Sequence, residues 1–180
     1  MERKRLNKSL RDAVVGNDLK KVKDFLAKDA NFNESDRDGN TPLHSAVKGG
    51  HPKIVQLLLN IKNLDPNEVN KCGHTPLHSA VIYGLFDIVQ LLLERTDVDS
   101  LKENWYGDTP LHSAAESGHL NIIQLLLEKT ETDPNKKNQV QNVVLNRIVE
   151  FKSPYRIKQK PTESQIQVAY LNSATNLGGG

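Results

Sequence analysis

The chain of 180 residues is poor in cysteine and in long apolar runs, and both absences restrict its class. Cys72 is the only cysteine, so no internal disulfide can form, and we expect a reducing compartment such as the cytoplasm. No apolar run approaches the roughly 20 residues that a membrane-spanning helix needs. The first residues, Met-Glu-Arg-Lys-Arg-Leu, contain no apolar signal core. These absences predict a soluble protein without a secretory signal.

The net charge of +2 is unevenly distributed along the sequence. Residues 136–180 carry seven basic and two acidic side chains, whereas residues 1–135 carry 17 basic and 20 acidic ones. Cationic stretches with interleaved aromatics can attract nucleic acid or acidic lipid, and this one contains Phe151, Lys152, Tyr155, Arg156, Lys158 and Lys160. We expect residues 153–180 to form a basic, flexible tail whose charge serves solubility. Binding to nucleic acid or an acidic membrane surface is the alternative.

What the sequence does contain is the hexapeptide Thr-Pro-Leu-His-Ser-Ala, which starts at Thr41, Thr75 and Thr109, 34 residues apart. A glycine and then the pattern Ile-(Val/Ile)-Gln-Leu-Leu-Leu follow each copy. A fixed period of this size indicates one supersecondary unit stacked repeatedly, with each unit contacting only its neighbours. Such a stack has no built-in chemistry, which favours binding over catalysis.

The repeating pattern is typical of a helix pair. Threonine is a good N-cap, and the proline that follows occupies the first helical position, where its missing N–H costs nothing. The first helix is expected to end near Gly50, and the second to begin at about residues 51–52. In the second helix, Ile54, Val55, Leu58 and Leu59 form a wide buried stripe. Residues 36–40, 70–74 and 104–108 are expected to form turns.

These motifs resemble the ankyrin repeat, whose hallmarks are Thr-Pro-Leu-His-x-Ala, a Gly-His pair and Ile-Val-x-Leu-Leu. The resemblance implies an all-α solenoid of stacked helix pairs with short turn fingers. It gives an ankyrin domain over residues 1–152, with a capping repeat at 7–34, repeats at 36–69, 70–103 and 104–137, and a degenerate capping helix at 143–151. The sequence departs from the family pattern in its period of 34 rather than 33, in serine at positions 45, 79 and 113, and in Leu85 replacing histidine.

The histidines invite a catalytic or metal-binding interpretation, which their spacing does not favour. His44, His78 and His112 share one repeat position, and His51 and His119 share another, so we expect their rings to bond backbone groups of neighbouring turns. Ligands for one ion must converge, and the Cys72-x-His74 pair alone is too small a ligand set. Adjacent serine and histidine side chains on a helix do not face each other. We therefore expect no enzyme, no cofactor and no metal.

The resemblance also implies a binding surface, formed by the turn tips and the exposed end of each first helix. On this sequence those positions are Arg37, Asp38, Asn40 and Lys48, then Lys71, Cys72, His74, Ile82 and Tyr83, then Trp105, Tyr106, Asp108, Glu116 and Ser117. Tryptophan and tyrosine dominate binding hot spots. A competing interpretation is that Trp105 and Tyr106 only cover a loop or dock the tail.

We therefore expect a monomeric, non-catalytic protein that binds another protein and masks or scaffolds it, with no small-molecule substrate. A short ankyrin protein of this kind resembles the inhibitor-of-NF-κB-like proteins of viruses and the secreted ankyrin effectors of intracellular bacteria. For such an effector, the location would be the host cytoplasm or nucleus. The alternative is that the chain is the targeting fragment of a larger enzyme.

Overall fold

The computed structural model of the chain describes residues 2–129. The end of the third predicted repeat (130–137), the predicted capping helix (143–151) and the predicted tail (153–180) lie outside these residues. Within them the chain forms eight helices and no strand. None of these helices is long and apolar enough to cross a membrane.

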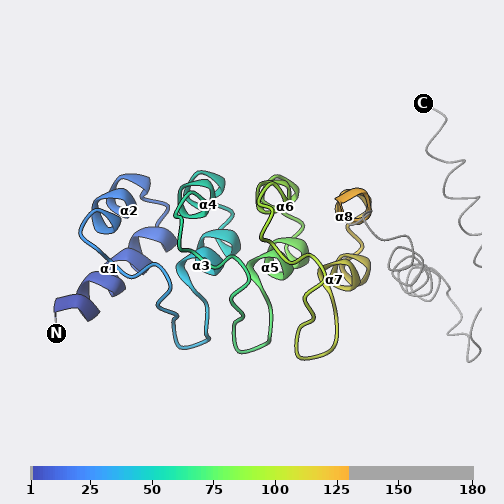
Figure 1. Cartoon of the computed structure of the whole chain (residues 1–180), viewed down its shortest axis with the longest axis horizontal. Helices are drawn as coiled ribbons and strands as arrows, with labels where there is room; N and C mark the ends of the chain where they lie inside the picture. The colour runs from blue at the N-terminus through green and yellow to red at the C-terminus, as the bar shows by residue number, and fades with distance from the viewer. Residues whose placement is uncertain (1, 130–180) are drawn as a thin grey trace, which may run out of the picture.

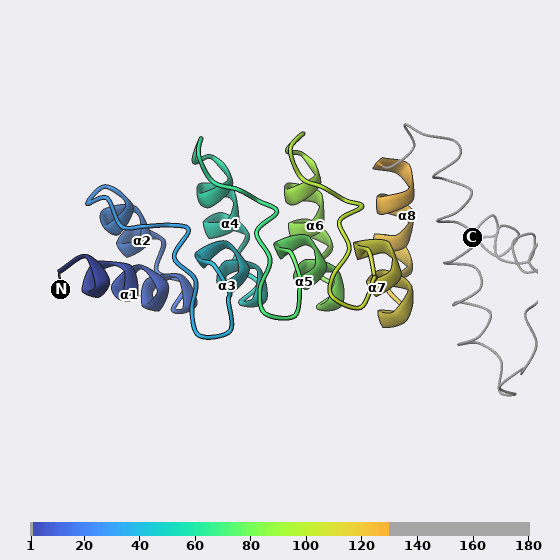
Figure 2. The ribbon, with the colours of Figure 1, turned by 60° about the horizontal axis from the view of Figure 1, so that its bottom comes forward.

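The helices form two rows (Figure 1). The inner row consists of α1 (Glu2–Val15), α3 (Pro42–Lys48), α5 (Pro76–Ile82) and α7 (Pro110–Ser117). The outer row consists of α2 (Leu19–Leu26), α4 (Pro52–Leu59), α6 (Phe86–Leu93) and α8 (Leu120–Lys129). Three loops project beyond the inner row, and we call their tips, residues 36–40, 70–74 and 104–108, the first, second and third finger. Figure 2 shows the three fingers side by side along one edge of the stack.

The inner helices begin where the hexapeptide predicts. The Thr41 side chain accepts a hydrogen bond from the His44 N–H, and Thr75 caps His78 in the same way. Proline follows each threonine at the first helical position, where its missing N–H removes no intrahelical hydrogen bond. The predicted starts of α3, α5 and α7 are therefore confirmed.

The N-terminal pair is built differently, because it lacks the hexapeptide. α1 begins at Glu2, ahead of the predicted start of the capping repeat at residue 7. Its Asn7 is buried, accepts a hydrogen bond from the Asn31 N–H at 2.8 Å and donates one to Glu34. Asp18 caps α2 by accepting from the Lys21 N–H at 3.0 Å. These side chains close the first unit of the stack.

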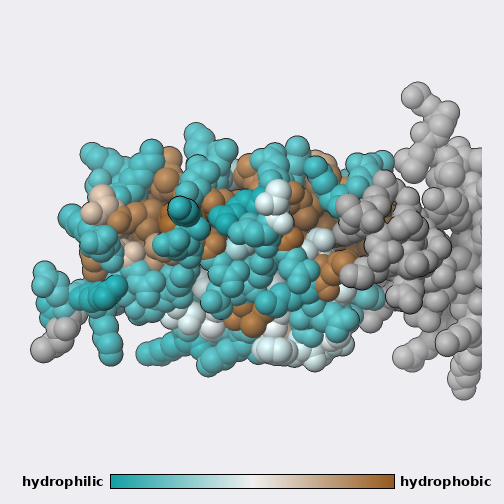
Figure 3. Space-filling view, viewed as in Figure 1, coloured by the Kyte–Doolittle hydropathy of each residue, from teal (hydrophilic) through white to brown (hydrophobic). Residues whose placement is uncertain are grey.

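The core is a continuous layer between the two rows. Leu58, Leu92 and Leu126 occupy the same position in successive outer helices, and each is at most 1% exposed. Burying a leucine side chain contributes about 2 kcal/mol relative to leaving it in water. Alanines at equivalent positions of α3, α5 and α7 are fully buried, which lets successive inner helices approach closely. In Figure 3 hydrophobic atoms show mainly in the band where the two rows meet.

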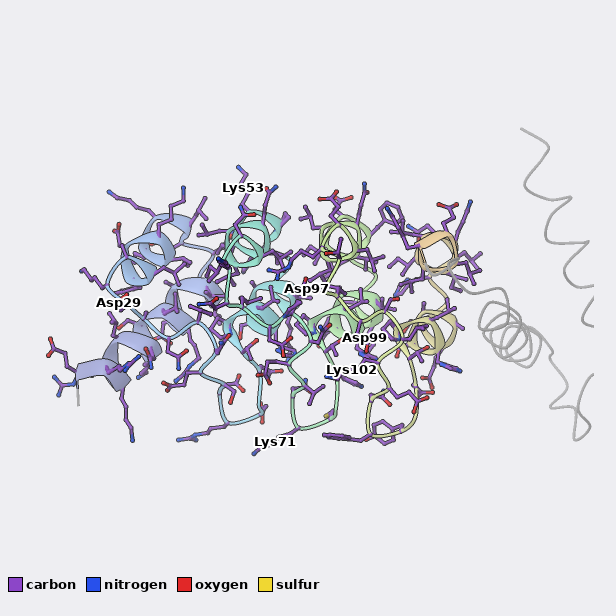
Figure 4. All side chains as sticks on the ribbon, in the orientation of Figure 1. Asp29, Lys53, Lys71, Asp97, Asp99 and Lys102 are labelled. Atoms are coloured by element: carbon purple, nitrogen blue, oxygen red, sulfur yellow. The ribbon has the colours of Figure 1, made fainter. Side chains whose placement is uncertain are left out.

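The loops that lead from the outer helices to the fingers also tie the repeats together. The Asn67 side chain donates to the Asp97 carbonyl at 2.6 Å and accepts from the Asp99 N–H at 2.7 Å. The Lys102 ammonium donates to the Asn67 carbonyl at 3.0 Å. Asp97, Asp99 and Lys102 lie on the face that Figure 4 shows. Consecutive repeats are therefore fixed to each other through these loops.

Candidate functional site

Each finger is held by one polar side chain at its first residue. The Asn70 side-chain oxygen accepts hydrogen bonds from the Cys72 N–H at 2.9 Å and the His74 N–H at 3.1 Å. Asp36 and Asn104 make the equivalent pair of bonds in the first and third fingers. These residues were not predicted from the sequence, although an Asp or Asn five residues before each hexapeptide threonine was a visible signal. The conformation of each finger is consequently fixed by hydrogen bonds within the chain itself.

Backbone hydrogen bonds join each finger to the next. The Lys71 N–H donates to the Asp38 carbonyl at 2.9 Å. One repeat later, the Trp105 N–H lies 3.5 Å from the Cys72 carbonyl, to which it donates. The three predicted tip pairs, at positions 37–38, 71–72 and 105–106, therefore form one continuous row along the stack.

Buried histidines connect the inner helices to the fingers. His44 Nε2 lies 2.9 Å from the His74 carbonyl, and His78 Nε2 lies 3.0 Å from the Asp108 carbonyl. The Nδ1 atom of His78 accepts from the Thr75 N–H at 3.3 Å. Because a backbone N–H can only donate and a carbonyl can only accept, the proton of the neutral ring is on Nε2. Burial lowers the pKa of His44, and it lowers the pKa of His78 to about 4.

Histidines at the second repeat position make similar contacts. His51 Nε2 lies 3.3 Å from the Val15 carbonyl, and His119 Nε2 lies 3.4 Å from the Ile82 carbonyl. Leu85, the departure in the middle repeat, packs against the core instead. The prediction that these histidines bond backbone groups of neighbouring turns is confirmed for His44, His78, His51 and His119. Across residues 2–129, no three His, Cys, Asp or Glu residues gather in a way that could hold a metal ion.

The residues predicted to bind a partner fall into two groups in the structure. One group is exposed to solvent: Arg37, Asp38, Lys48, Lys71, Cys72, Tyr83, Trp105, Tyr106, Glu116 and Ser117. The other group is half-buried: Asn40, His74, Ile82 and Asp108. The side chains of the first group are therefore accessible to a partner. Among them, Lys71 lies at the tip of the second finger in Figure 4.

The half-buried residues have roles inside the stack. The Asn40 side-chain oxygen accepts from the Asn70 amide at 3.1 Å, which links two fingers. The His74 ring stacks on His78, with ring centroids 5.7 Å apart. The carbonyls of His74, Asp108 and Ile82 accept the histidine bonds described above. These contacts make the four residues parts of the scaffold, and their prediction as binding residues stays a prediction.

One exposed residue was overlooked. An offset of 33 residues aligns Val15, at the end of α1, with Lys48, and the further offset of 34 aligns it with Ile82 and Glu116. Val15 is 66% exposed, so this position is also accessible to solvent in the capping repeat. The predicted binding positions begin at the first hexapeptide repeat, so they do not include the equivalent position of the capping repeat.

Trp105 is both exposed and engaged. Its side chain is 66% exposed, yet its indole Nε1 donates to the Lys71 carbonyl at 3.1 Å. Its ring covers Gly73, where a Cβ atom would lie 2.8 Å from two ring carbons. Tyr106 is 77% exposed, and its backbone N–H donates to the Asn104 side-chain oxygen at 2.8 Å. The interpretation that the pair covers a loop therefore applies to one face of Trp105.

Two hollows among the described residues differ in their relation to the candidate surface. A cavity of about 990 Å³ at the N-terminal end lies beside Asp29 (Figure 4) and is lined by Leu6, Leu26, Phe32 and Ile61 together with charged rim residues. None of the predicted binding residues lines it. A smaller one, of about 230 Å³, lies on the finger row and is bordered by Lys71 and Trp105. The smaller hollow is therefore the one that belongs to the candidate surface.

Comparison with known proteins agrees with the helix-pair architecture. The family model for ankyrin repeats, described as three copies, matches residues 10–102 and 61–138. No curated protein matches the chain. The two matched ranges overlap and together cover most of the chain, including all three hexapeptides. This chain belongs to the ankyrin repeat family.

Proposed function

We propose that this chain is a non-catalytic module that binds a partner protein along its finger row and inner-helix ends, and that it acts by masking or scaffolding that partner. Ankyrin repeats are generally protein–protein interaction modules. The proposal includes binding as a monomer and a cytoplasmic location, which the single cysteine supports.

The observation that carries the proposal is the exposure of three aromatic side chains. Tyr83 is 51% exposed, Trp105 66% and Tyr106 77%. Large aromatic side chains can each bury about 150–250 Å² in an interface, and they dominate binding hot spots. The core of the stack does not require Tyr83 or Tyr106, because the buried cluster consists of other residues. Their exposure therefore supports contact with a partner protein.

The rigidity of the fingers supports the same role. Asn70 fixes the second finger through two side-chain hydrogen bonds, and Asn104 fixes the third. Ordering a loop on binding costs free energy, so a surface that is already ordered retains more of its contact energy as affinity. The chain acts by covering part of the partner's surface, and no covalent bond is made or broken.

The test is cross-linking capture from cell extract with the wild-type chain, the double variant Tyr83→Ala/Tyr106→Ala and the control Lys53→Ala. Lys53 is exposed on α4 in the outer row, and Figure 4 shows it pointing away from the fingers. The proposal expects the double variant to lose a protein that wild type and control both retain, with unchanged melting temperature. Equal capture by all three chains would refute it.

A further inference from the structure

The third finger presents Trp105 in a state that restricts what can bind to it. The indole has one hydrogen-bond donor, and the Lys71 carbonyl already accepts it at 3.1 Å. One side of the ring lies against Gly73. Since the side chain is still 66% exposed, what remains for a partner is the outer aromatic face. That face is apolar and carries the negative side of the ring quadrupole.

The charge around this face favours a cation. Residues 2–64 carry 13 basic and 8 acidic side chains, whereas residues 65–129 carry 4 basic and 10 acidic ones. Tyr83, Trp105 and Tyr106 all lie in this acidic half. The net charge of residues 65–129 is therefore −6, and the Arg95–Asp97 ion pair leaves this sum unchanged because it contains one charge of each sign. The summed field of this half attracts positive charge.

A hollow beside Trp105 offers room for a side chain. It measures about 230 Å³ and is bordered by Trp105, Glu68, Lys71, Val69 and Ser35, among others. An aromatic wall, the Glu68 carboxylate and the apolar side chain of Val69 suit the stem and head of an arginine or lysine side chain. Lys71 is the one cation on the lining, and it opposes this occupant.

We propose that the third finger binds a cationic segment of the partner protein, with an arginine or lysine side chain that stacks on the outer face of Trp105 and is balanced by Glu68. The inference rests on the proposed function, because it names the chemistry of the partner at the same surface. Arginine fits best, since its planar guanidinium stacks on aromatic faces and is weakly hydrated.

A phage library of random dodecapeptides, selected on the immobilised full chain, tests the assignment. The enriched peptides should contain arginine or lysine next to apolar residues, and their binding should fall about tenfold in Trp105→Leu but much less in Trp105→Phe. Leucine keeps an apolar side chain without a ring, so this pair separates stacking on a π face from hydrophobic contact. If the enriched peptides are neutral or acidic and lose binding in Trp105→Leu, the cationic assignment is overturned but the proposed function is not. A library without any Trp105-dependent or Tyr106-dependent binder would count against the proposed function itself.

The sign of the charge has its own matched pair of variants, because Glu68 and Lys71 border the same hollow. With an enriched arginine peptide as the probe, Glu68→Gln should weaken binding and Lys71→Gln should strengthen it, each by about two- to fivefold. The opposite signs would overturn the proposal.

The competing occupant is the chain's own basic stretch. Trp105 is the only tryptophan, so its fluorescence reports on the site in the full chain. Replacing Lys152, Arg156, Lys158 and Lys160 together by glutamine should leave that fluorescence unchanged. A changed emission in the absence of peptide would mean that the chain's own segment fills the site, and it would overturn the assignment to a partner protein.

Discussion

Acidification from pH 7.5 to pH 5 should destabilise the stack through His78. Its side chain is fully buried, and burial lowers its pKa from 6.5 to about 4. The neighbouring His74 acts in the same direction, whereas Asp108 and Asp99 and the bond to the Asp108 carbonyl oppose the shift. Because the unfolded chain binds a proton near pH 6.5 and the folded chain does not, stability is complete above that pH. It is then lost progressively as the pH falls towards 4.

The size of the effect follows from the shift. For a pKa of 6.5 in the unfolded chain and about 4 in the folded chain, the loss is about 2 kcal/mol at pH 5 and about 3 kcal/mol at pH 4. The pKa of His44 is lowered by burial as well, so it adds in the same direction. Asp36 and Asp97 have a pKa lowered below 3.8, and their stabilising contribution is lost only under more acidic conditions. The range from pH 7.5 to 5 therefore isolates the histidines.

The assay is urea unfolding followed by helical circular dichroism at several pH values, with His78→Gln as the matched control. Glutamine keeps an N–H donor that can reach the Asp108 carbonyl, but it does not titrate in this range. The variant should be less stable at pH 7.5, because the Thr75 N–H loses its acceptor. It should lose about 2 kcal/mol less than wild type on going to pH 5. Equal losses in the two chains would refute the account of His78.

Two further predictions concern the third finger and what it covers. Gly73→Ala should destabilise the stack by about 2 kcal/mol or more, because residue 73 has φ +75° and a Cβ atom there would lie 2.5 Å from the Trp105 nitrogen. Gly107→Ala, at φ +78° with nothing within 4 Å, should cost only about 1 kcal/mol in the same urea measurement, and equal costs would contradict the packing argument. Trp105→Ala should lower the unfolding free energy by about 1 kcal/mol through its lost hydrogen bond, whereas Tyr106→Ala should change it by less than about 0.5 kcal/mol. Thermal melts of both variants check this difference, and a larger drop for Tyr106→Ala would show that its side chain packs within the stack.

The sequence was sufficient to predict whatever is local to one repeat. Thr41 and Thr75 are N-caps because a β-hydroxyl accepts from an N–H three residues later, and this depends on nearby residues alone. The buried stripe of α4 likewise follows from the helical period. Repetition then predicts the stack, since no single pair could bury such a stripe.

Contacts between residues about 34 apart could not be predicted in this way. Whether Trp105 points into solvent or lies on Gly73 depends on the rotation and rise between repeats, which no local pattern determines. The same geometry places the Asp108 carbonyl at His78 and makes Asp108 part of the scaffold. Sequence therefore predicted which positions vary between fingers, and the structure shows which atoms of those positions remain accessible.

Hydrogen–deuterium exchange of the full chain, with and without a bound partner or selected peptide, tests the central claim most directly. The account predicts slower exchange at residues 70–74 and 104–108 and at the end of α5 near Tyr83. It predicts no change along the outer helices α4, α6 and α8. Protection confined to the outer row, with the second and third fingers unchanged, would contradict it.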